Sequence, residues 1–260
     1  MYPLGITLDD VYRMLLLMFR TGALLSTVPI FGHVSVPRIL RIWLMILFAV
    51  MLYPSAAVSG YQPPATFPQL AIVILSELAI GFTMGFAIII VFAAVQFAGH
   101  LIGLEMGLAI SNVIDPMSAG ELSIIGEFFY LVSLLVFLMI DGHHAVIEAL
   151  VRSYELIPIA GGVFSADLIS FIITLTGNVF ILGVKLSAPV IITLFIVNVV
   201  LGIIARIVPQ MNVFIVGFTL AVAVGLLMIQ LSFPYFRVVL VDSFHLLESD
   251  LLRIIQLMQG

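Results

Sequence analysis

Two adjacent histidines, His143 and His144, stand five and four residues before Glu148, and Arg152 follows four residues after it. This group is the nearest approach to a metal site in the chain. Residues four apart share one face of a helix, so His144, Glu148 and Arg152 would form a ladder of ion pairs. Adjacent helical residues point apart, so the two imidazoles would not converge on one ion. The spacing favours a ladder on the surface or in an interface, and we expect no metal and no cofactor.

A second set of candidates consists of charges within or beside apolar stretches: Glu77, Glu105, Asp115, Lys185 and Arg206. An ionisable group inside a membrane is a functional hypothesis by default, and a proton or ion relay would use such groups. The alternative is pairing between helices in a protein-lined interior. Because the five charges are scattered and follow no repeated pattern, structural pairing is favoured over a relay.

The sequence contains no motif for an activated nucleophile or a phosphate-binding loop. The chain has no cysteine, which removes thiolate nucleophiles, disulfides and Cys-ligated metals. H-E-x-x-H, G-x-S-x-G and GxxxxGK[ST] are all absent. Only nine residues are Lys or Arg and the net charge is −5, so the chain lacks the clustered cations that nucleic acid requires. We expect neither an enzyme nor a nucleic-acid-binding protein.

The composition indicates a membrane protein, because 63% of the residues are hydrophobic, 9% are charged and the mean hydropathy is +1.32. Soluble domains are roughly 45–50% apolar and about 25% charged. Acidic residues near the start, Asp9 and Asp10, argue against a cleaved signal peptide. About six runs approach the roughly 20 residues that a spanning helix needs: 11–31, 42–58, 70–97, 124–140, 171–200 and 213–232.

Several of these runs are short or interrupted. The run 42–58 ends at Tyr53-Pro54, the run 124–140 is cut by Asp141-Gly142, and Pro189 lies inside 171–200. Backbone groups freed at such breaks must find partners within protein, which favours a subunit buried among other chains. The segment from Phe236 to Met258 has the periodicity of an amphipathic helix, on the membrane or on a partner.

The segment between Val91 and Glu127 predicts a helix through Glu105, an ordered apolar loop at about 108–120, and a new helix near Glu121. Asp115-Pro116 is typical of a turn, because proline has a fixed φ and disfavours the helical conformation at the residue before it. Loops usually face water, so an apolar loop should be packed or should occlude something. Three methionines in or near irregular segments could seal around a changing shape, with core packing as the alternative: Met106, Met117 and Met211.

Glycines at intervals of four form a stripe in the same part of the chain: Gly81, Gly85, Gly99, Gly103 and Gly107. Small residues at this spacing let helix backbones approach closely in a membrane. We expect the stripe to pack tightly, with another subunit as the favoured partner. The chain reads as one unit of two halves that meet near 158–170.

Several stretches together resemble the FliR/SctT family of the type III secretion export gate. They are Ser26-Thr27-Val28-Pro29 with Val36-Pro37-Arg38, GLEMGLAISNVIDP at 103–116, FLMIDGHH at 137–144, IPIAGG at 157–162 and RIVPQMNVFIVGF at 206–218. They occur in family order and spacing over nearly the whole chain. The stretches at 103–116 and 206–218 are the most specific.

The resemblance implies an all-α integral membrane protein of long, kinked and broken helical hairpins that assembles helically with partner subunits. Its N-terminal part, 1–165, would be FliP-like and would include the plug loop. Its C-terminal part, 166–260, would be a FliQ-like hairpin with an amphipathic tail. The family works in the bacterial inner membrane, at the flagellar basal body and its ring, or in an injectisome.

The resemblance also implies partners and site residues. The chain would complete the FliP/FliQ/FliR channel for unfolded export substrates, and FlhB would dock at the cytoplasmic entrance. The plug that keeps the channel closed would comprise Ile110, Val113, Ile114, Asp115, Pro116 and Met117, with aliphatic residues where relatives often have Phe. The FlhB-binding turn would comprise Arg206, Pro209, Gln210, Met211 and Asn212. The rival functions are a lone secondary transporter or ion channel, which would need an internal repeat and a midplane polar site, and a membrane enzyme.

Overall fold

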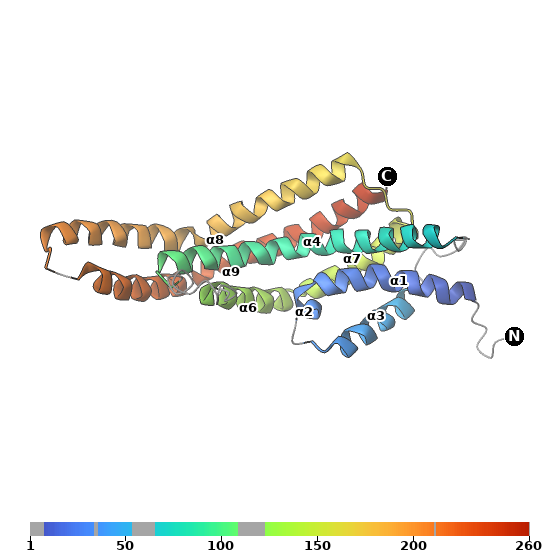
Figure 1. Ribbon diagram of the computed structural model, residues 1–260, viewed down its shortest axis with the longest axis horizontal. Helices are drawn as coiled ribbons and strands as arrows, with labels where there is room; N and C mark the ends of the chain where they lie inside the picture. The colour runs from blue at the N-terminus through green and yellow to red at the C-terminus, as the bar shows by residue number, and fades with distance from the viewer. Residues whose placement is uncertain (1–7, 34–35, 54–65, 109–122, 211, 260) are drawn as a thin grey trace. The chain divides into compact units, whose positions relative to one another are not determined.

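The computed structural model describes residues 8–33, 36–53, 66–108, 123–210 and 212–259. All regular structure in these residues is helical (Figure 1), which confirms the predicted all-α class for this part of the chain. The helices are α1 (Leu8–Thr27), α2 (Pro29–Gly32), α3 (Arg38–Leu52), α4 (Phe67–Glu105), α6 (Ile124–Met139), α7 (Gly142–Leu156), α8 (Ala166–Ile207) and α9 (Val213–Gln259).

Three helices, α4, α8 and α9, are long and apolar enough to cross a bilayer. They have 39, 42 and 47 residues, more than the roughly 20 that span the hydrocarbon core. Helices α6 and α7 meet the same criteria only as a pair bent by 68°. The bend falls at Asp141-Gly142, where the sequence predicted a cut, and Asp141 adopts the left-handed conformation with φ 58°.

The first two predicted runs form shorter helices. The run 11–31 overlaps α1, which has 20 residues and carries several charges. The run 42–58 overlaps α3, which has 15 residues, begins at Arg38 and ends at Leu52. Neither helix is a candidate span among the described residues. The six runs thus correspond to three long helices, one bent pair and two short helices.

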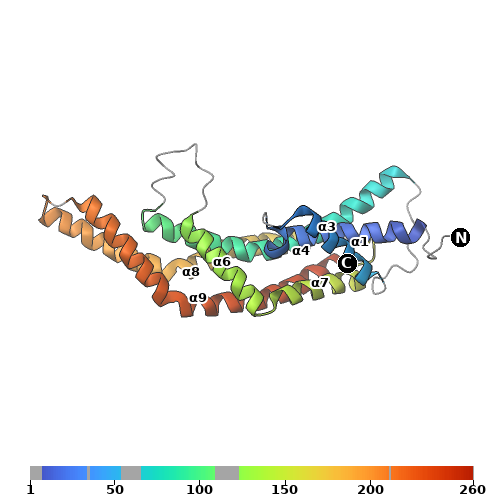
Figure 2. The ribbon, with the colours of Figure 1, turned by 90° about the horizontal axis from the view of Figure 1, so that it is seen from below.

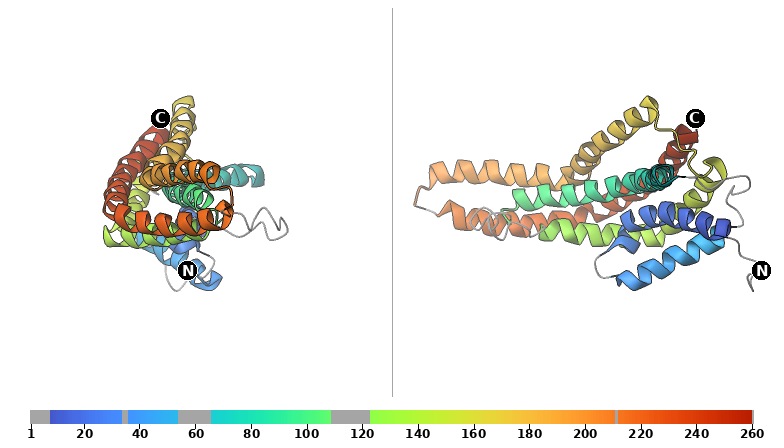
Figure 3. Two further views of the ribbon diagram at one scale, coloured as in Figure 1. Left: turned by 90° about the vertical axis from the view of Figure 1, so that its left-hand side faces the viewer. Right: turned by 45° about the vertical axis from the view of Figure 1, so that its right-hand side comes forward.

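The C-terminal region differs from the prediction, because the apolar run 213–232 and the amphipathic segment after it form one helix, α9. Pro234 lies inside α9, and Pro189 lies inside α8. A proline inside a helix removes one backbone hydrogen bond, but membrane helices tolerate it where other groups satisfy the freed carbonyl. Beside the turn at 208–212, α8 and α9 run next to each other as an antiparallel hairpin (Figures 1 and 3).

The chain divides into two compact units. Unit 1 comprises Met1–Ile90, Asp141–Leu175 and Phe244–Gly260, and unit 2 comprises Val91–Ile140 and Thr176–Ser243. The parts expected from the sequence, 1–165 and 166–260, are consecutive, whereas each unit takes residues from both. The expected division into 1–165 and 166–260 comes from the family resemblance, and it stays a prediction.

The core of unit 1 is built around α1. Leucines on one side of α1, among them Leu16, Leu17 and Leu24, are at most 1% exposed. Helix α3 packs alongside α1 (Figure 3). At the end of this contact the Tyr53 hydroxyl donates a hydrogen bond to the Asp10 carboxylate, and this bond raises the pKa of Tyr53. The contact joins α1 and α3 at a polar point as well as through apolar packing.

Aromatic contacts join three helices of unit 2. Phe92 on α4 makes edge-to-face contacts with Phe137 and Tyr130 on α6, at ring-centroid distances of 5.7 and 5.8 Å. Phe129 on α6 stacks on Phe236 of α9 at 4.6 Å. Such pairs contribute about 0.5–1.5 kcal/mol each beyond the area they bury. They hold α6 between α4 and α9.

Candidate functional site

Helix α4 ends in a Schellman motif just before the predicted plug loop. The Leu108 N–H donates to the Gly103 carbonyl at 3.0 Å, and the Gly107 N–H donates to the Leu104 carbonyl at 3.0 Å. Gly107 has φ 77°, a left-handed conformation that glycine adopts without a steric penalty. Gly107, which the sequence pattern grouped with the packing glycines, therefore serves here to end the helix.

Helix α6 begins with a capped first turn on the other side of the loop. The Ser123 hydroxyl accepts a hydrogen bond from the Gly126 N–H at 3.3 Å, as an N-cap serine does. The same hydroxyl donates to the Gly99 carbonyl of α4 at 3.5 Å. The helix was expected to begin near Glu121; in the described residues its first residue is Ile124.

The two ends of the loop lie against each other. Figure 2 shows the end of α4 beside the start of α6. A Cβ atom added at Gly99 would lie 2.5 Å from the Gly126 Cα, and one added at Gly103 would lie 2.7 Å from the Ser123 Oγ. Only glycine permits an approach this close. We call residues 99–108 and 123–126 the loop frame.

A third helix of unit 2 reaches the loop frame through Met106. The Met106 side chain is 0% exposed, and a Cβ atom added at Gly225 of α9 would lie 2.7 Å from its Cγ. The sequence singled out Met106 as a flexible side chain near an irregular segment. The structure places it in contact with α9, so α4, α6 and α9 all meet at the loop frame.

The predicted plug residues themselves lie outside the described residues, and their assignment stays a prediction: Ile110, Val113, Ile114, Asp115, Pro116 and Met117. Met117 and Glu121 fall in the same gap, as does the loop range 108–120 beyond Leu108. The structure describes how the two ends of this loop are held.

The first two glycines of the stripe have a different partner. Gly81 lies against the backbone of α1 at Arg20, and Gly85 lies against Thr27. A side chain at either glycine would collide with α1. The sequence favoured another subunit as the partner of the stripe. The partner found for Gly81 and Gly85 is the chain's own α1, and for Gly99 and Gly103 it is the chain's own α6.

A buried ion pair lies beside these glycines, in unit 1. Arg20 donates to Glu77 through Nε at 2.7 Å and through Nη2 at 3.0 Å, and both side chains are 0% exposed. The Arg20 Nη1 donates to the carbonyls of Ser153 and Ile157 at the end of α7. The Glu77 Oε1 also accepts from the Ala160 N–H at 3.0 Å. The pair therefore holds α1, α4 and α7 together.

The other candidate charges show no such network. Glu77 confirms the prediction of structural pairing, and Asp115 lies outside the described residues. Glu105, Lys185 and Arg206 are exposed and form no ion pair with another described residue. Arg20 is the residue that sequence reasoning missed, although a charge within the run 11–31 was a visible signal.

The predicted FlhB-binding turn lies at the tip of the α8–α9 hairpin. Arg206, Pro209, Gln210 and Asn212 are all exposed, and Met211 lies outside the described residues. The Asn212 side chain accepts a hydrogen bond from the Ile215 N–H at 3.3 Å, so it caps the start of α9. The side chains of Arg206, Pro209 and Gln210 are accessible to a partner.

The histidine group differs in part from the ladder expected. Arg152 pairs with Glu148 at 2.6 Å as predicted, but His144 pairs with Asp141 at 3.2 Å. The rings of His143 and His144 do not point apart; their centroids are 4.2 Å from each other. Ligand atoms of Asp141, His143 and His144 lie within 4.8 Å of one another. The Asp141 and His144 side chains are about 70% exposed, which agrees with a surface pair at the start of α7.

These helices and this loop frame define a multi-pass α-helical membrane protein. A family model described as "Bacterial export proteins, family 1" matches residues 11–247. The chain belongs to this family of bacterial export proteins.

Curated relatives agree with that assignment over most of their length. The chain is 34% identical over 243 residues to the flagellar biosynthetic protein FliR of Bacillus subtilis, covering 91% of this chain and 92% of the relative. It is 32% identical over 240 residues to FliR of Aquifex aeolicus, covering 91% of each. It is 32% identical over 219 residues to FliR of Escherichia coli, covering 84% and 82%.

Family membership confirms several predictions. The chain is a FliR-family export protein of flagellar biosynthesis and is not an enzyme. Its long apolar helices and its family make it a multi-pass protein of the bacterial inner membrane, within the flagellar export apparatus.

Proposed function

We propose that the chain is a core subunit of the flagellar type III protein export gate, in which it completes a channel with FliP and FliQ subunits. Unfolded flagellar proteins pass through this channel across the inner membrane. Family membership supports the proposal, and so do α8 and α9, of whose most apolar windows only 17% is buried. Apolar faces that the chain leaves uncovered need lipid or neighbouring subunits.

The observation that carries a gating role is the loop frame. Three helices meet where the described chain borders the predicted apolar loop, through Gly99, Gly103 and Met106, so both ends of that loop are held. Ile110 and Val113 are branched aliphatic residues, which close a narrow pore by excluding water. In our proposal the loop 108–120 is the plug that keeps the channel closed until a substrate arrives.

The same proposal assigns the rest of the chain. Residues 1–165 form the FliP-like part and residues 166–260 the FliQ-like hairpin, and the subunits assemble helically. The turn of Arg206, Pro209, Gln210, Met211 and Asn212 binds FlhB at the cytoplasmic entrance. Arg206 next to this turn agrees with the positive-inside rule.

The experiment that tests the proposal is a mild-detergent purification of the tagged chain, co-expressed with its FliP- and FliQ-type neighbours, followed by intact-mass measurement. One large complex containing all three subunits is the expected result. A stable chain that binds neither neighbour would contradict the proposal and would favour the lone transporter, which ion-flux measurements in liposomes would then test.

The plug assignment has its own test. Replacing Ile110 and Val113 together by Gly removes the apolar side chains and should make the closed complex leak small ions in a conductance measurement. Gly177→Ala, a change on α8 where an added Cβ meets nothing within 4 Å, is the control and should leave the conductance unchanged. Equal conductance of the double variant and the wild type would rule out the plug.

A further inference from the structure

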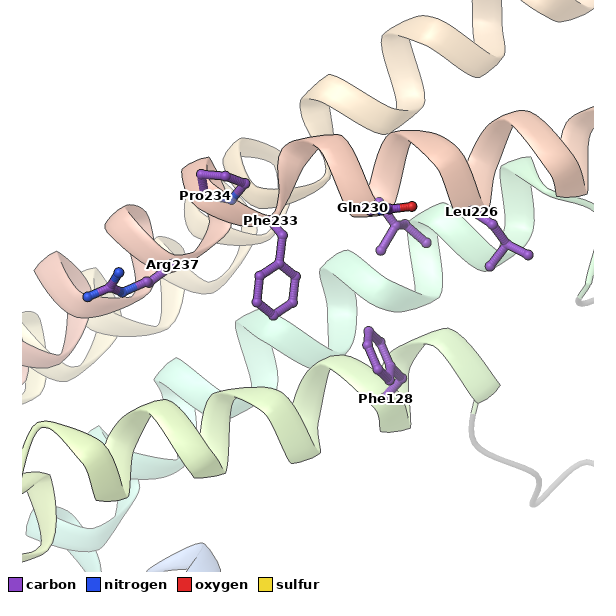
Figure 4. Close-up of a pocket in the computed structure, with 7 residues that line it drawn as sticks. Phe128, Leu226, Gln230, Phe233, Pro234 and Arg237 are labelled. Atoms are coloured by element: carbon purple, nitrogen blue, oxygen red, sulfur yellow. The ribbon is translucent and has the colours of Figure 1, made fainter.

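Each long helix of the α8–α9 hairpin contains a proline, and the two prolines lie at the same level of the hairpin. Pro189 lies inside α8 and Pro234 inside α9. Figure 4 shows Pro234 beside an apolar pocket, with the neighbouring Phe233 ring reaching toward α6. The hydroxyl of Tyr235 donates a hydrogen bond to the Lys185 carbonyl of α8 at 3.2 Å. This bond joins the two helices next to their prolines.

The Lys185 carbonyl is the group that Pro189 deprives of its helical donor. In a regular α-helix this carbonyl would accept a bond from the N–H of residue 189. Proline has no N–H, and its ring pushes against the carbonyl four residues earlier. A backbone carbonyl without a donor is strongly unfavourable in hydrocarbon, and neighbouring helices commonly supply the missing group. Here Tyr235 supplies it from α9.

Side-chain hydroxyls bond to further carbonyls of α8 around its proline. Ser187 donates to the Gly183 carbonyl at 2.9 Å, and Thr193 donates to the Pro189 carbonyl at 2.9 Å. Hydroxyls that bond to a carbonyl one turn earlier often bend helices, and sharp kinks fall almost always at proline. Helix α8 is therefore predisposed to bend here, and Pro234 gives α9 the same property at the same level.

On the side of the prolines away from the tip, both helices are anchored to the rest of unit 2. The Phe180 ring of α8 packs edge-to-face on Phe97 of α4 at 5.5 Å. A Cβ atom added at Gly183 would lie 2.4 Å from the Phe97 Cδ1, so α8 lies close against α4. On α9, Phe236 stacks on Phe129 of α6 at 4.6 Å. The base of the hairpin is thus held by α4 and α6.

Toward the tip, α8 and α9 pack on each other. Leu201 of α8 is 6% exposed, and a Cβ atom added at Gly217 of α9 would lie 3.3 Å from the Leu201 Cδ1. This part also meets α4 where Gly225 contacts Met106. Methionine has three rotatable bonds and adapts to a changed shape, so this contact can follow a movement. The tip can move as one packed pair of helices.

We propose that the hairpin bends at a hinge formed by Pro189 and Pro234. The hydrogen bond from Tyr235 to the Lys185 carbonyl holds this hinge in one bend. Its distance of 3.2 Å is at the long end of the range for a hydroxyl donor, so it restrains the hinge without making it rigid. The lever from 190 to the turn at 208–212 is ~30 Å long, so a change of ~10° moves the tip by ~5 Å. The hinge belongs to the chain itself and does not depend on the proposed function.

The first test measures the bend on the purified full-length chain in detergent. The chain has no cysteine, so introduced cysteine pairs can carry spin labels. Ile181→Cys with Gln210→Cys spans the hinge, and the control pair, Phe195→Cys with Gln210→Cys, lies beyond it; all three positions are exposed. Tyr235→Phe should shift or broaden the distances of the first pair and leave the control pair unchanged. No change in either pair, or equal changes in both, would overturn the proposal.

The second test is a double-mutant cycle on the thermal unfolding of the same chain. Tyr235→Phe should lower the Tm by about 2–4 °C, the effect of one lost hydrogen bond. Pro189→Ala restores an N–H for the Lys185 carbonyl, so Tyr235→Phe in that background should have a much smaller effect. Thr219→Val is the control, because its hydroxyl bonds at 3.0 Å to the Ile215 carbonyl, which also has its regular helical donor.

Equal losses from Tyr235→Phe in both backgrounds would mean that the hydroxyl does not serve the carbonyl freed by Pro189, and the proposal would fail. A loss no larger than that of Thr219→Val would have the same meaning. The spin-label test does not use Pro189→Ala, so it decides the proposal if that variant does not fold.

Discussion

The core of unit 1 buries charged side chains, whereas the α8–α9 hairpin of unit 2 exposes large apolar side chains. In unit 1, Arg20 and Glu77 are fully buried and hydrogen-bonded to each other and to backbone groups of α7 and the turn after it. In the hairpin, large apolar side chains are exposed, such as Ile181 at 67% and Phe195 at 63%. The most apolar window of α4 is 61% buried within the chain, against 17% for those of α8 and α9.

This difference indicates which helices pack within the chain and which present surfaces to lipid or to other subunits. A buried charge pair is tolerated only where its hydrogen bonds are complete, so unit 1 must hold its helices in fixed places. Exposed apolar faces of helices in a membrane protein are covered by lipid or by other subunits. Unit 1 therefore has the character of a self-contained core, and the hairpin has the character of an assembly surface.

The largest effect should come from breaking the buried pair. Arg20→Ala leaves the Glu77 carboxylate buried without its partner and should lower the free energy of unfolding by about 3–5 kcal/mol, measured on the purified chain in detergent. Arg152→Ala breaks the exposed pair with Glu148 and serves as the control, with an expected loss of about 0–1 kcal/mol. Similar losses for the two variants would mean that unit 1 has no such rigid core.

A smaller effect should come from the loop frame. Gly99→Ala places a Cβ atom 2.5 Å from the Gly126 Cα, and the resulting overpacking should cost about 1–3 kcal/mol of unfolding free energy. Gly177→Ala is the matched control in α8, where an added Cβ meets nothing within 4 Å. There the better helix propensity of Ala should raise stability by up to about 1 kcal/mol. Equal effects would show that α4 and α6 do not approach as closely as described.

The hairpin should respond to assembly more than to folding. Phe195→Ser removes an exposed apolar ring and should change the unfolding free energy of the isolated chain by about 0.5 kcal/mol or less. The same variant should reduce recovery of the complex with FliP and FliQ, because the ring is available for a neighbour. Unchanged recovery would mean that this face of α8 meets lipid.

The smallest perturbation is a probe at the hairpin tip. A crosslinking residue at Gln210, which is exposed, should capture FlhB without a measurable change in stability. The same residue at Gly177, within α8, provides the control for position along the hairpin and should not capture FlhB. Capture of periplasmic proteins alone from Gln210 would mean that the topology of the hairpin is inverted.

Much of the fold could be predicted from hydropathy and turn chemistry. The apolar runs at 70–97, 171–200 and 213–232 lie inside α4, α8 and α9, and the cut at Asp141-Gly142 is the bend between α6 and α7. Proline was a poor guide to helix ends, because Pro189 and Pro234 both lie within helices. Neighbouring groups can satisfy the carbonyls that these prolines free, and a sequence window does not contain those neighbours.

The sequence predicted close packing at the candidate site, but it did not predict which helices would be in contact there. The glycine stripe indicated close packing, yet nothing in its spacing distinguished α1 from α6 or showed that Gly107 ends a helix. The Schellman bonds of Gly107 depend on backbone conformation at one position. Ser123 was not recognised as a cap, although its bond with the Gly126 N–H is local. Its second bond, to the Gly99 carbonyl, joins residues 24 positions apart and depends on how α4 and α6 pack.

The sequence by itself determined that the protein is a helical membrane protein, and it determined the family. It also excluded reactions that need a cysteine or a phosphate-binding loop. These properties depend on composition and on short motifs, which are local. Only the tertiary structure decided that Arg20 pairs with Glu77, 57 residues away, and that Ser123 at the start of α6 bonds to Gly99 of α4, 24 residues away. Long-range contacts and hollows form between helices, and their geometry is fixed by which faces pack together rather than by any one stretch of residues.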